Sequence, residues 1–206
     1  MEPAQLFYVD GSPFARLCRT LIIDWELPVE MVKLDWPLDQ SFFDENPLGQ
    51  VPVLKTIGET IFPTSQIAEQ LLAMTVDPMA PDFDPLADRQ MLLTILAMGD
   101  AMVAGNQIVR TGLRPTAENT YGIDIVESHG MRVARTLDWL EQRCSKWVMG
   151  DTVSVCDYAL ACLLLWSDSR CPIEWRTRPK ITRIVDQLAT ADSFAQTVPS
   201  PWKAVT

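Results

Sequence analysis

The sequence predicts two domains, a small α/β domain followed by an all-α domain, and three observations support this prediction. Short β-like and amphipathic helical segments alternate over residues 1–76. Residues 77–85 then hold three prolines and three aspartates without periodicity. Beyond them almost only helical patterns remain. We therefore expect a βαβαββα domain with a small mixed sheet at residues 1–76, a linker at 77–84 and an all-α bundle at 85–206.

The first domain is expected to open with a strand, a helix and a second strand. Residues 6–9 form an aromatic and β-branched run that ends at Asp10-Gly11, as a strand entering a turn does. Pro28 ends the helix, and residues 29–34 favour a second strand. The buried face of the helix is marked by apolar residues at helical spacing: Phe14, Leu17, Cys18, Leu21, Ile22 and Trp25.

Further elements complete the first domain. The last of them is a helix for which Thr64 or Ser65 is the expected N-cap, because short hydroxyl side chains favour that position. In order, the elements are a short irregular helix at 38–45, a hairpin of residues 53–56 and 59–62 that turns at Ile57-Gly58, and the helix ending near Ala73.

The second domain is expected to be helical throughout. One helix start is unusually well specified, because Ser154 is followed three residues later by Asp157, in the spacing of a capping box. This pair has a structural role in our interpretation, and the cap contributes about 1 kcal/mol. The expected helices are residues 86–111, 117–146, 154–169 and 179–191.

Composition excludes several classes of function. A net charge of −10 opposes binding to phosphate backbones and to anionic membranes, so we expect no nucleic-acid partner and no membrane partner. The first residues lack a signal-peptide pattern, and the richest apolar run, residues 158–166, is too short to span a bilayer. His129 is the only histidine, and the odd set of cysteines contains no C-x-x-C pair. We therefore expect a cytoplasmic protein without a disulfide framework or a metal site.

The chemistry of the first domain depends first on Ser12-Pro13. Serine at an N-cap and proline at the first helical position explain this pair without any function. However, the helix start directly follows a strand, and ligands of open α/β folds commonly bind at the carboxyl ends of strands. First-turn N–H groups favour an anion there, so the hydroxyl of Ser12 could also stabilise a thiolate.

Two further segments could contribute to the same site. Pro52 directly precedes a strand, which is consistent with a cis peptide bond in a tight turn, and such a turn would leave the backbone of Val51 available to an extended peptide. Thr64 and Ser65 lie at a second helix start, whose hydroxyl and N–H groups could hold a carboxylate. Each signal is weak when taken alone.

Together these segments resemble the cytosolic glutathione transferase family, in the form with serine at the thiol-activating position. The resemblance covers essentially the whole chain. It implies a thioredoxin-like glutathione domain, a helical domain that supplies much of the electrophile pocket, and a homodimer. It rests on Ser-Pro-Phe-x-Arg at 12–16, Asn-Pro-x-Gly-x-Val-Pro at 46–52, the serine of the following helix, the proline-bearing linker and Ser-x-x-Asp at 154–157.

The resemblance also implies roles for individual residues. Ser12 would donate a hydrogen bond to the glutathione sulfur, Val51 would pair its backbone with the cysteinyl part, and Ser65 would hold the γ-glutamyl carboxylate. The thiolate would attack a small hydrophobic electrophile or a peroxide, as in detoxification, with glutathione as co-substrate and no metal. The residues assigned to glutathione binding are Phe14, Gln50, Val51, Pro52, Thr64 and Ser65.

The chain departs from the family pattern at one position and offers one rival activator. Thr64 stands where many members carry an acidic or amide residue that meets the glutathione amino group. Tyr8 is the rival thiol activator, although its place within residues 6–9 favours core packing. Position 12 is not cysteine, which argues against disulfide exchange because that chemistry needs a protein thiolate. His129 is more typical of a structural residue than of a site residue.

Two alternatives to a transferase remain open at this stage. The fold could serve as a non-catalytic module that binds another protein, and the Thr64 departure gives this alternative weight because a fold does not determine a function. A glutathione-dependent isomerase is the second alternative, and only its substrate distinguishes it.

Overall fold

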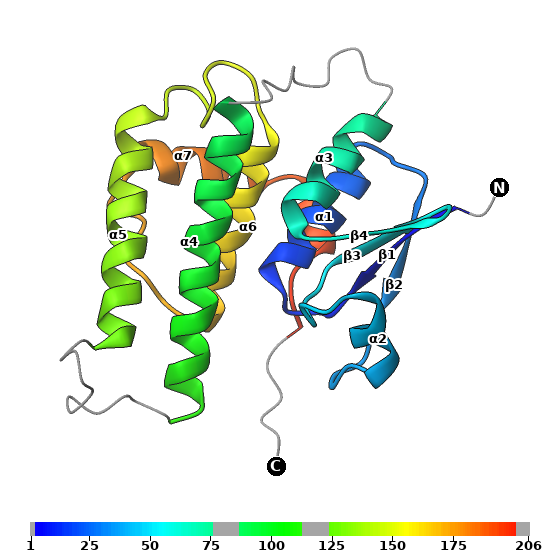
Figure 1. Ribbon diagram of the computed structural model, residues 1–206. Coiled ribbons are helices and arrows are strands. Elements are labelled where there is room, and N and C mark those ends of the chain that lie inside the picture. Colours follow the sequence, from blue (N-terminus) through cyan, green and yellow to red (C-terminus); the bar gives the residue numbers. More distant parts are fainter. Residues whose placement is uncertain (1–2, 76–86, 113–123, 201–206) are drawn as a thin grey trace. The chain divides into compact units, whose positions relative to one another are not determined.

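The computed structural model describes residues 3–75, 87–112 and 124–200 (Figure 1). By their contacts, the residues fall into two compact units, the first formed by residues 1–82 with 188–206 and the second by residues 83–187. The division expected from the sequence assigned the C-terminal segment to the helical part, whereas its contacts lie with the first unit. The expected linker lies outside the described residues.

The first unit is built on a mixed four-stranded sheet with the order β2-β1-β3-β4. Strand β1 (Ala4–Tyr8) runs parallel to β2 (Val29–Lys33), and β3 (Val53–Thr56) runs antiparallel to both β1 and β4 (Glu59–Ile61). Leu6 is paired with Met31 on one side and with Leu54 on the other. A parallel pair followed by an antiparallel hairpin confirms the mixed sheet that the sequence predicted.

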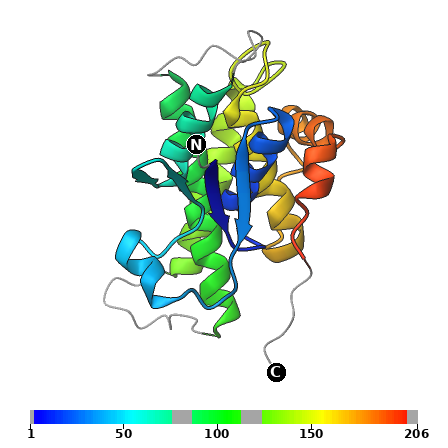
Figure 2. The same cartoon turned by 90° about the vertical axis from the view of Figure 1, so that its right-hand side faces the viewer.

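Helices α1 (Pro13–Asp24) and α3 (Thr64–Met74) pack against each other and against the sheet, as Figures 1 and 2 show. The core between these helices and the sheet is aliphatic and fully buried, which provides most of the free energy that holds the unit together. The short helix α2 (Gln40–Glu45) buries none of its residues. The buried core includes Leu6, Leu17, Leu21, Leu54 and Leu71.

Several helix boundaries differ from the sequence-based expectation, and the helix expected at 117–146 begins at Ile125, after its N-cap Asp124, and ends at Arg143. The N-cap of α3 is Pro63, and Thr64 and Ser65 are the first residues of the helix itself, so neither of them caps it. The Pro63 carbonyl accepts hydrogen bonds from the N–H groups of Gln66 and Ile67. Pro63 therefore occupies the cap position, despite the preference of serine and threonine for it. The helix expected at 179–191 ends earlier, and a separate helix α8 (Asp192–Gln196) follows it.

The second unit consists of helices packed around α4 (Ala87–Arg110), which contacts both α5 (Ile125–Arg143) and α6 (Val155–Arg170). Helix α6 is buried along most of its length, as is typical of a helix that is apolar all round. The start of α7 (Pro179–Leu188) is capped from another helix, because the Glu141 carboxylate of α5 accepts hydrogen bonds from the N–H groups of Lys180 and Ile181 at 3.1 and 3.0 Å.

The predicted capping box at the start of α6 is confirmed. Asp157 is completely buried, and its carboxylate accepts hydrogen bonds from the N–H and hydroxyl of Ser154, both at 2.8 Å. It also accepts from the N–H of Val148, at 2.8 Å. Asp157 therefore satisfies a buried loop as well as a helix start, which the spacing of the sequence motif did not reveal.

Residues 88–110 of α4 are long and apolar enough to cross a membrane by length and composition, and their most apolar 18-residue stretch has a mean hydropathy of 1.4. Half of the most apolar part of this helix is buried inside the protein. Core helices of globular proteins commonly have the same composition. This run is longer than residues 158–166, which the sequence analysis took to be the richest apolar segment.

The cysteines yield a first testable prediction. All five are free, and Cys144 and Cys156 are almost completely buried. Burial, reinforced by the charge of Asp157, raises the pKa of Cys144 to about 11 and that of Cys156 to about 12. At pH 8 the thiolate fraction of each is therefore below roughly one part in a thousand. In native protein at pH 8, iodoacetamide is expected to label the less buried Cys171 first.

Peptide mapping by mass spectrometry after timed labelling measures this order. We expect Cys144 and Cys156 to react at least about tenfold more slowly than Cys171, because reactivity follows both access and thiolate fraction. Unfolded protein serves as the control, since all five thiols should then react at similar rates. Equal rates at Cys156 and Cys171 in the native protein would contradict the prediction.

Candidate functional site

The site begins at the turn between β1 and α1. Gly11 has a φ of 100°, a conformation that favours glycine, and Ser12 follows it as the N-cap of α1. The Ser12 Oγ atom accepts a hydrogen bond from the N–H of Ala15 at 3.2 Å and donates one to the carbonyl of Val51 at 3.4 Å. The cap expected from the sequence is confirmed, and Ser12 also reaches a second loop.

The second loop runs from Asn46 to Pro52, and its Val51–Pro52 peptide bond is cis, in agreement with the sequence analysis. Asn46, almost completely buried, organises the loop through its side chain. Its Nδ2 donates to the carbonyl of Gln50 at 2.7 Å, and its Oδ1 accepts from the N–H of Leu48 at 3.1 Å. Pro52 is buried, while Val51 remains half-buried next to Ser12.

The remaining predicted site residues lie on the elements around these loops. Phe14 is half-buried in the first turn of α1, and Gln50 is exposed. Thr64 and Ser65 begin α3, with Ser65 buried and Thr64 half-buried. Because the first N–H groups of a helix have no partner within the helix, the starts of α1 and α3 both present backbone donors. The structure joins two of the predicted site residues directly, through the hydrogen bond from Ser12 to the Val51 carbonyl.

Tyr8, the rival activator, lies at the end of β1 and is half-buried. The guanidinium of Arg19 lies over its ring, with 4.4 Å between the guanidinium carbon and the ring centroid. Such a cation–π contact stabilises the packing of an aromatic side chain. This position supports a structural role for Tyr8.

His129 lies in α5 of the second unit, where its Cβ would be 3.6 Å from a β-carbon added at Gly105 of α4. Its Nδ1 atom is buried and has no hydrogen-bond partner among the described residues. A β-carbon at Gly105 would make only an ordinary van der Waals contact there, so the approach of the two helices does not require glycine. No group of His, Cys, Asp and Glu side chains in the described part of the chain is arranged to hold a metal ion.

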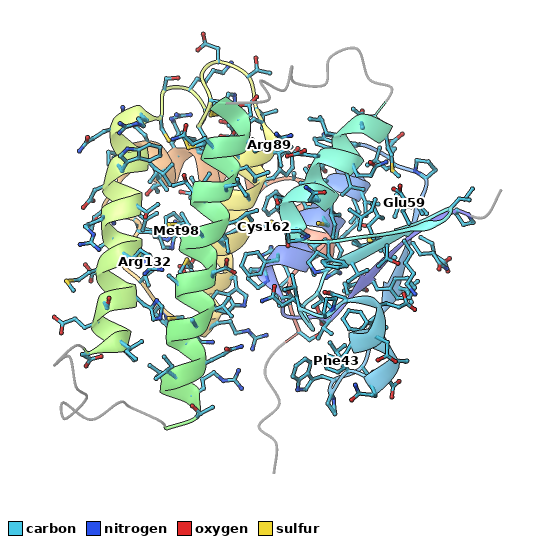
Figure 3. All side chains as sticks on the ribbon, viewed as in Figure 1. Phe43, Glu59, Arg89, Met98, Arg132 and Cys162 are labelled. Carbon is cyan, nitrogen blue, oxygen red and sulfur yellow. The ribbon has the colours of Figure 1, made fainter. Side chains whose placement is uncertain are left out.

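A cavity of about 370 Å³ lies elsewhere in the first unit, between α2 and the sheet. Phe42 and Glu45 of α2 line it together with Phe7 and Lys55 of the strands. The ammonium of Lys55 is paired with the Glu45 carboxylate and lies 5.0 Å from the centroid of the Phe7 ring. Ser12 and Val51 do not line the cavity, whereas Asn46, whose side chain organises the Val51 loop, does. Figure 3 labels Phe43, which also lies on α2.

Asn46 is the residue whose importance the sequence analysis missed. In the sequence, Asn46 stands out only as the first residue of the motif at 46–52. An asparagine three residues before a glycine nevertheless indicates a turn, because its side chain can hydrogen-bond to nearby backbone and stabilise that turn. The N–H of Gly49 donates to the Asn46 carbonyl at 2.9 Å, and Gly49 has a φ of +59°.

Gly49→Ala is expected to lower the free energy of unfolding by about 1–2 kcal/mol, because a side chain disfavours this backbone conformation. The added Cβ would also lie only 2.6 Å from Cε1 of Phe43, so either the Phe43 ring or the loop that carries Val51 must shift. Urea denaturation measures the stability, and calorimetry measures any change in affinity for glutathione.

Gly58→Ala is a matched control for this variant. Gly58 also has a left-handed conformation, with a φ of +82°, but a Cβ there would meet nothing within 4 Å. It should lose stability through its backbone alone and leave ligand binding unchanged. Equal behaviour of the two variants in both measurements would show that the contact with Phe43 has no consequence.

Comparisons with known proteins agree with this architecture. The profile of the family "Glutathione S-transferase, N-terminal domain" matches residues 6–75, and that of "Glutathione S-transferase, C-terminal domain" matches residues 123–186. An uncharacterized GST-like protein of Escherichia coli K12, YibF, is 32% identical over 194 residues, which cover 91% of this chain and 95% of that protein.

Two solved structures are similar over nearly the whole chain. A glutathione S-transferase from Methylobacterium radiotolerans, in complex with glutathione sulfonate, is 25% identical with a TM-score of 0.81, covering 98% of this chain and 97% of that one. A glutathione S-transferase from Methylobacillus flagellatus, with glutathione bound, is 27% identical with a TM-score of 0.80, covering 96% and 100%. The thioredoxin-like first domain and the helical second domain are those of these structures, and this chain belongs to the glutathione S-transferase family.

Proposed function

We propose that this protein is a glutathione transferase-like enzyme in which the Ser12 hydroxyl stabilises the glutathione thiolate. The observation that carries the proposal is the position of Ser12 Oγ, at the N-terminus of α1 and 3.4 Å from the Val51 carbonyl. A rotation of the hydroxyl from that carbonyl towards a sulfur would supply a charge-assisted hydrogen bond, next to the positive end of the helix dipole.

Glutathione itself would be held by the loops around Ser12. The backbone of Val51, oriented by Pro52, would pair with the cysteinyl part, and the start of α3 at Thr64 and Ser65 would hold the γ-glutamyl carboxylate. Phe14 and Gln50 would line the ends of the ligand. The bound glutathione and glutathione sulfonate of the two similar structures support this choice of ligand.

The proposed reaction is attack of the thiolate on a small hydrophobic electrophile. With an aromatic halide, the sulfur forms a bond to the ring carbon, the carbon–halogen bond breaks and halide leaves. The thiol proton passes to solvent. The protein contributes by stabilising the thiolate and holding it in place, and it forms no covalent intermediate with the substrate.

Calorimetry with glutathione, together with turnover of 1-chloro-2,4-dinitrobenzene, tests this proposal. We expect saturable binding and a rate above that of the uncatalysed reaction. Absence of both would refute the enzyme and favour a module that binds another protein, as the unusual Thr64 suggests. Binding without turnover would favour a narrower substrate, such as that of a glutathione-dependent isomerase.

We further propose that the protein is a cytoplasmic homodimer. Large apolar side chains are exposed on two helices of the second unit, at Leu93 and Val109 of α4 and at Met131 of α5. Leu93 and Val109 lie far apart along α4, so they form no single patch, and the homodimer is proposed from the family resemblance with Leu93 as a contact to test. The free state of all five cysteines supports a reducing compartment. Sedimentation equilibrium is expected to give twice the chain mass, and Leu93→Glu should shift the equilibrium towards monomer.

A further inference from the structure

The C-terminal segment of the chain, residues 188–200, is packed against the helix that Ser12 begins. Its helix α8 contacts α1, and its end reaches the turn before Ser12. Neither contact follows from the family profiles, whose matches end at residue 186. Both contacts lie within the first unit.

The first contact is a buried polar cluster around Arg16, which is only 4% exposed. Its Nη2 donates to the Phe194 carbonyl at 3.1 Å, its Nε donates to Thr197 Oγ1 at 3.4 Å, and its guanidinium lies 5.5 Å from the Phe194 ring centroid. Thr20 lies 3.3 Å from the same Thr197 oxygen. A cation near the C-terminal end of α8 is favourable because the carbonyls of that turn lack helical partners.

The second contact is made by Asp10, two residues before Ser12. Its Oδ2 accepts hydrogen bonds from both the N–H and the hydroxyl of Ser200, the former at 3.2 Å. Arg19 of α1 lies 3.6 Å from its Oδ1, and Lys33 of β2 lies 3.7 Å from its Oδ2. One carboxylate thus joins the first strand, the first helix, the second strand and the C-terminal segment.

The balance of forces on Asp10 keeps its carboxyl ionised. Burial alone would raise the pKa of this carboxyl, but the hydrogen bonds from Ser200 and the charges of Lys33 and Arg19 outweigh it and hold the pKa below its ordinary value. A charged acceptor makes stronger hydrogen bonds than a neutral one. The turn from Asp10 to Ser12 is therefore held from both of its ends, by Asp10 and by the cap of α1.

We propose that Asp10 and Ser200 are positioning residues for the Ser12 site, and that the C-terminal segment fixes the turn that carries Ser12, so that its hydroxyl can rotate from the Val51 carbonyl to the glutathione sulfur. This inference rests on the proposed function. Neither residue touches the sulfur in this proposal. Their effect passes through the turn at Gly11, a residue with few backbone restrictions that would otherwise let the Ser12 side chain change direction.

Three variants of the full chain test the proposal. Ser200→Ala should raise the KM for glutathione about three- to tenfold, and Asp10→Asn about ten- to thirtyfold, with smaller changes in kcat. Ser200→Thr, which keeps the hydroxyl, should restore most of the loss. The matched controls lie in the second unit: Ser145→Ala removes a hydroxyl that donates to Gly150, and Asp138→Asn removes an ion pair with Arg178. Neither control should change the KM.

A purely structural role is distinguished by two further readouts. The pH profile of kcat at saturating glutathione, which reports groups in the bound complex, should move to higher pH in Asp10→Asn, and this movement should vanish when Ser12→Ala is also present. Exchange of the Ala15 amide, which donates to Ser12 Oγ, should be faster in Ser200→Ala than in the wild type when measured by NMR. Equal KM values, an unchanged profile and unchanged Ala15 exchange would overturn the proposal.

The two proposals can fail separately. If the wild-type protein neither binds nor turns over glutathione, the proposed function is wrong, and the Ala15 exchange still decides whether Asp10 and Ser200 position Ser12. If glutathione is turned over but Ser200→Ala and Asp10→Asn behave like their controls, the proposed function stands and the positioning role is wrong.

Discussion

Ser12→Ala is expected to lower kcat/KM for glutathione conjugation about 10- to 100-fold. The variant removes a hydrogen bond to a developing thiolate, and a bond to a charged group contributes about 1.5–3 kcal/mol. The pKa of the bound thiol should rise by about one to two units, because helix termini and donors lower thiol pKa values by this amount. The acid limb of the pH profile of kcat, which reports groups in the bound complex, should therefore move to higher pH.

Ser12 is also the N-cap of α1, so the loss of its hydroxyl has a structural component that must be separated. Removing the cap costs about 1 kcal/mol of stability, which urea denaturation measures. Ser12→Asp separates the two roles, because aspartate is a good cap but cannot donate to a thiolate and repels it. It should keep the stability and lose the activity. Ser12→Thr should keep much of both.

Tyr8→Phe is the control for the rival activator. It keeps the ring beneath Arg19 and removes only the hydroxyl. We expect wild-type kinetics from this variant. Loss of activity in Tyr8→Phe, with full activity in Ser12→Ala, would transfer the activating role to Tyr8.

Asp157→Ala should be the most destabilising single substitution proposed here, with a loss of about 3–5 kcal/mol in the free energy of unfolding. It leaves the buried N–H of Val148 and both donors of Ser154 without their acceptor. Each unsatisfied buried donor costs about 1–3 kcal/mol, and the three costs are not fully additive. The midpoint of urea denaturation measures the loss.

Asp151→Ala provides a matched control, because Asp151 lies in the same loop but is exposed. Its substitution should change the stability by less than about 0.5 kcal/mol. Similar losses in the two variants would show that the loop, rather than the Asp157 carboxylate, determines the stability.

The effect of Asp157 should depend on pH. Burial raises the pKa of this carboxyl above its ordinary value, against the opposing hydrogen bonds from Val148 and Ser154. A carboxyl whose pKa is higher in the folded state contributes full stability below its unfolded pKa and loses that contribution as the pH rises through the folded value. The loss caused by Asp157→Ala should therefore be largest in acid and smaller at neutral pH.

Local sequence signals were sufficient to predict much of the secondary structure of the first unit. The apolar spacing from Phe14 onward indicated α1, and Ser12 followed by Pro13 indicated its cap. These features depend on neighbours within one or two turns of helix, so they can be predicted without the rest of the chain. The same holds for the capping box of Ser154 and Asp157.

Contacts between distant segments decided the rest. Helix α8 formed as a separate helix whose C-terminal turn meets Arg16, and Ser12 of α1 met the Val51 carbonyl of another loop. Sequence periodicity carries no information about such partners, because the residues that satisfy one another lie far apart along the chain.

The sequence by itself determined the order of elements in the first domain, the two classes of domain and the cap at Ser12. Only the tertiary structure placed Ser12 against the Val51 carbonyl, showed that the Asn46 side chain holds its loop by a hydrogen bond, and joined Asp10 to Ser200. The physical reason is the separation along the chain between the residues that interact. Helix caps and periodic faces are set by neighbouring residues, whereas a carboxylate or hydroxyl that joins distant segments is specified only when folding brings those segments together.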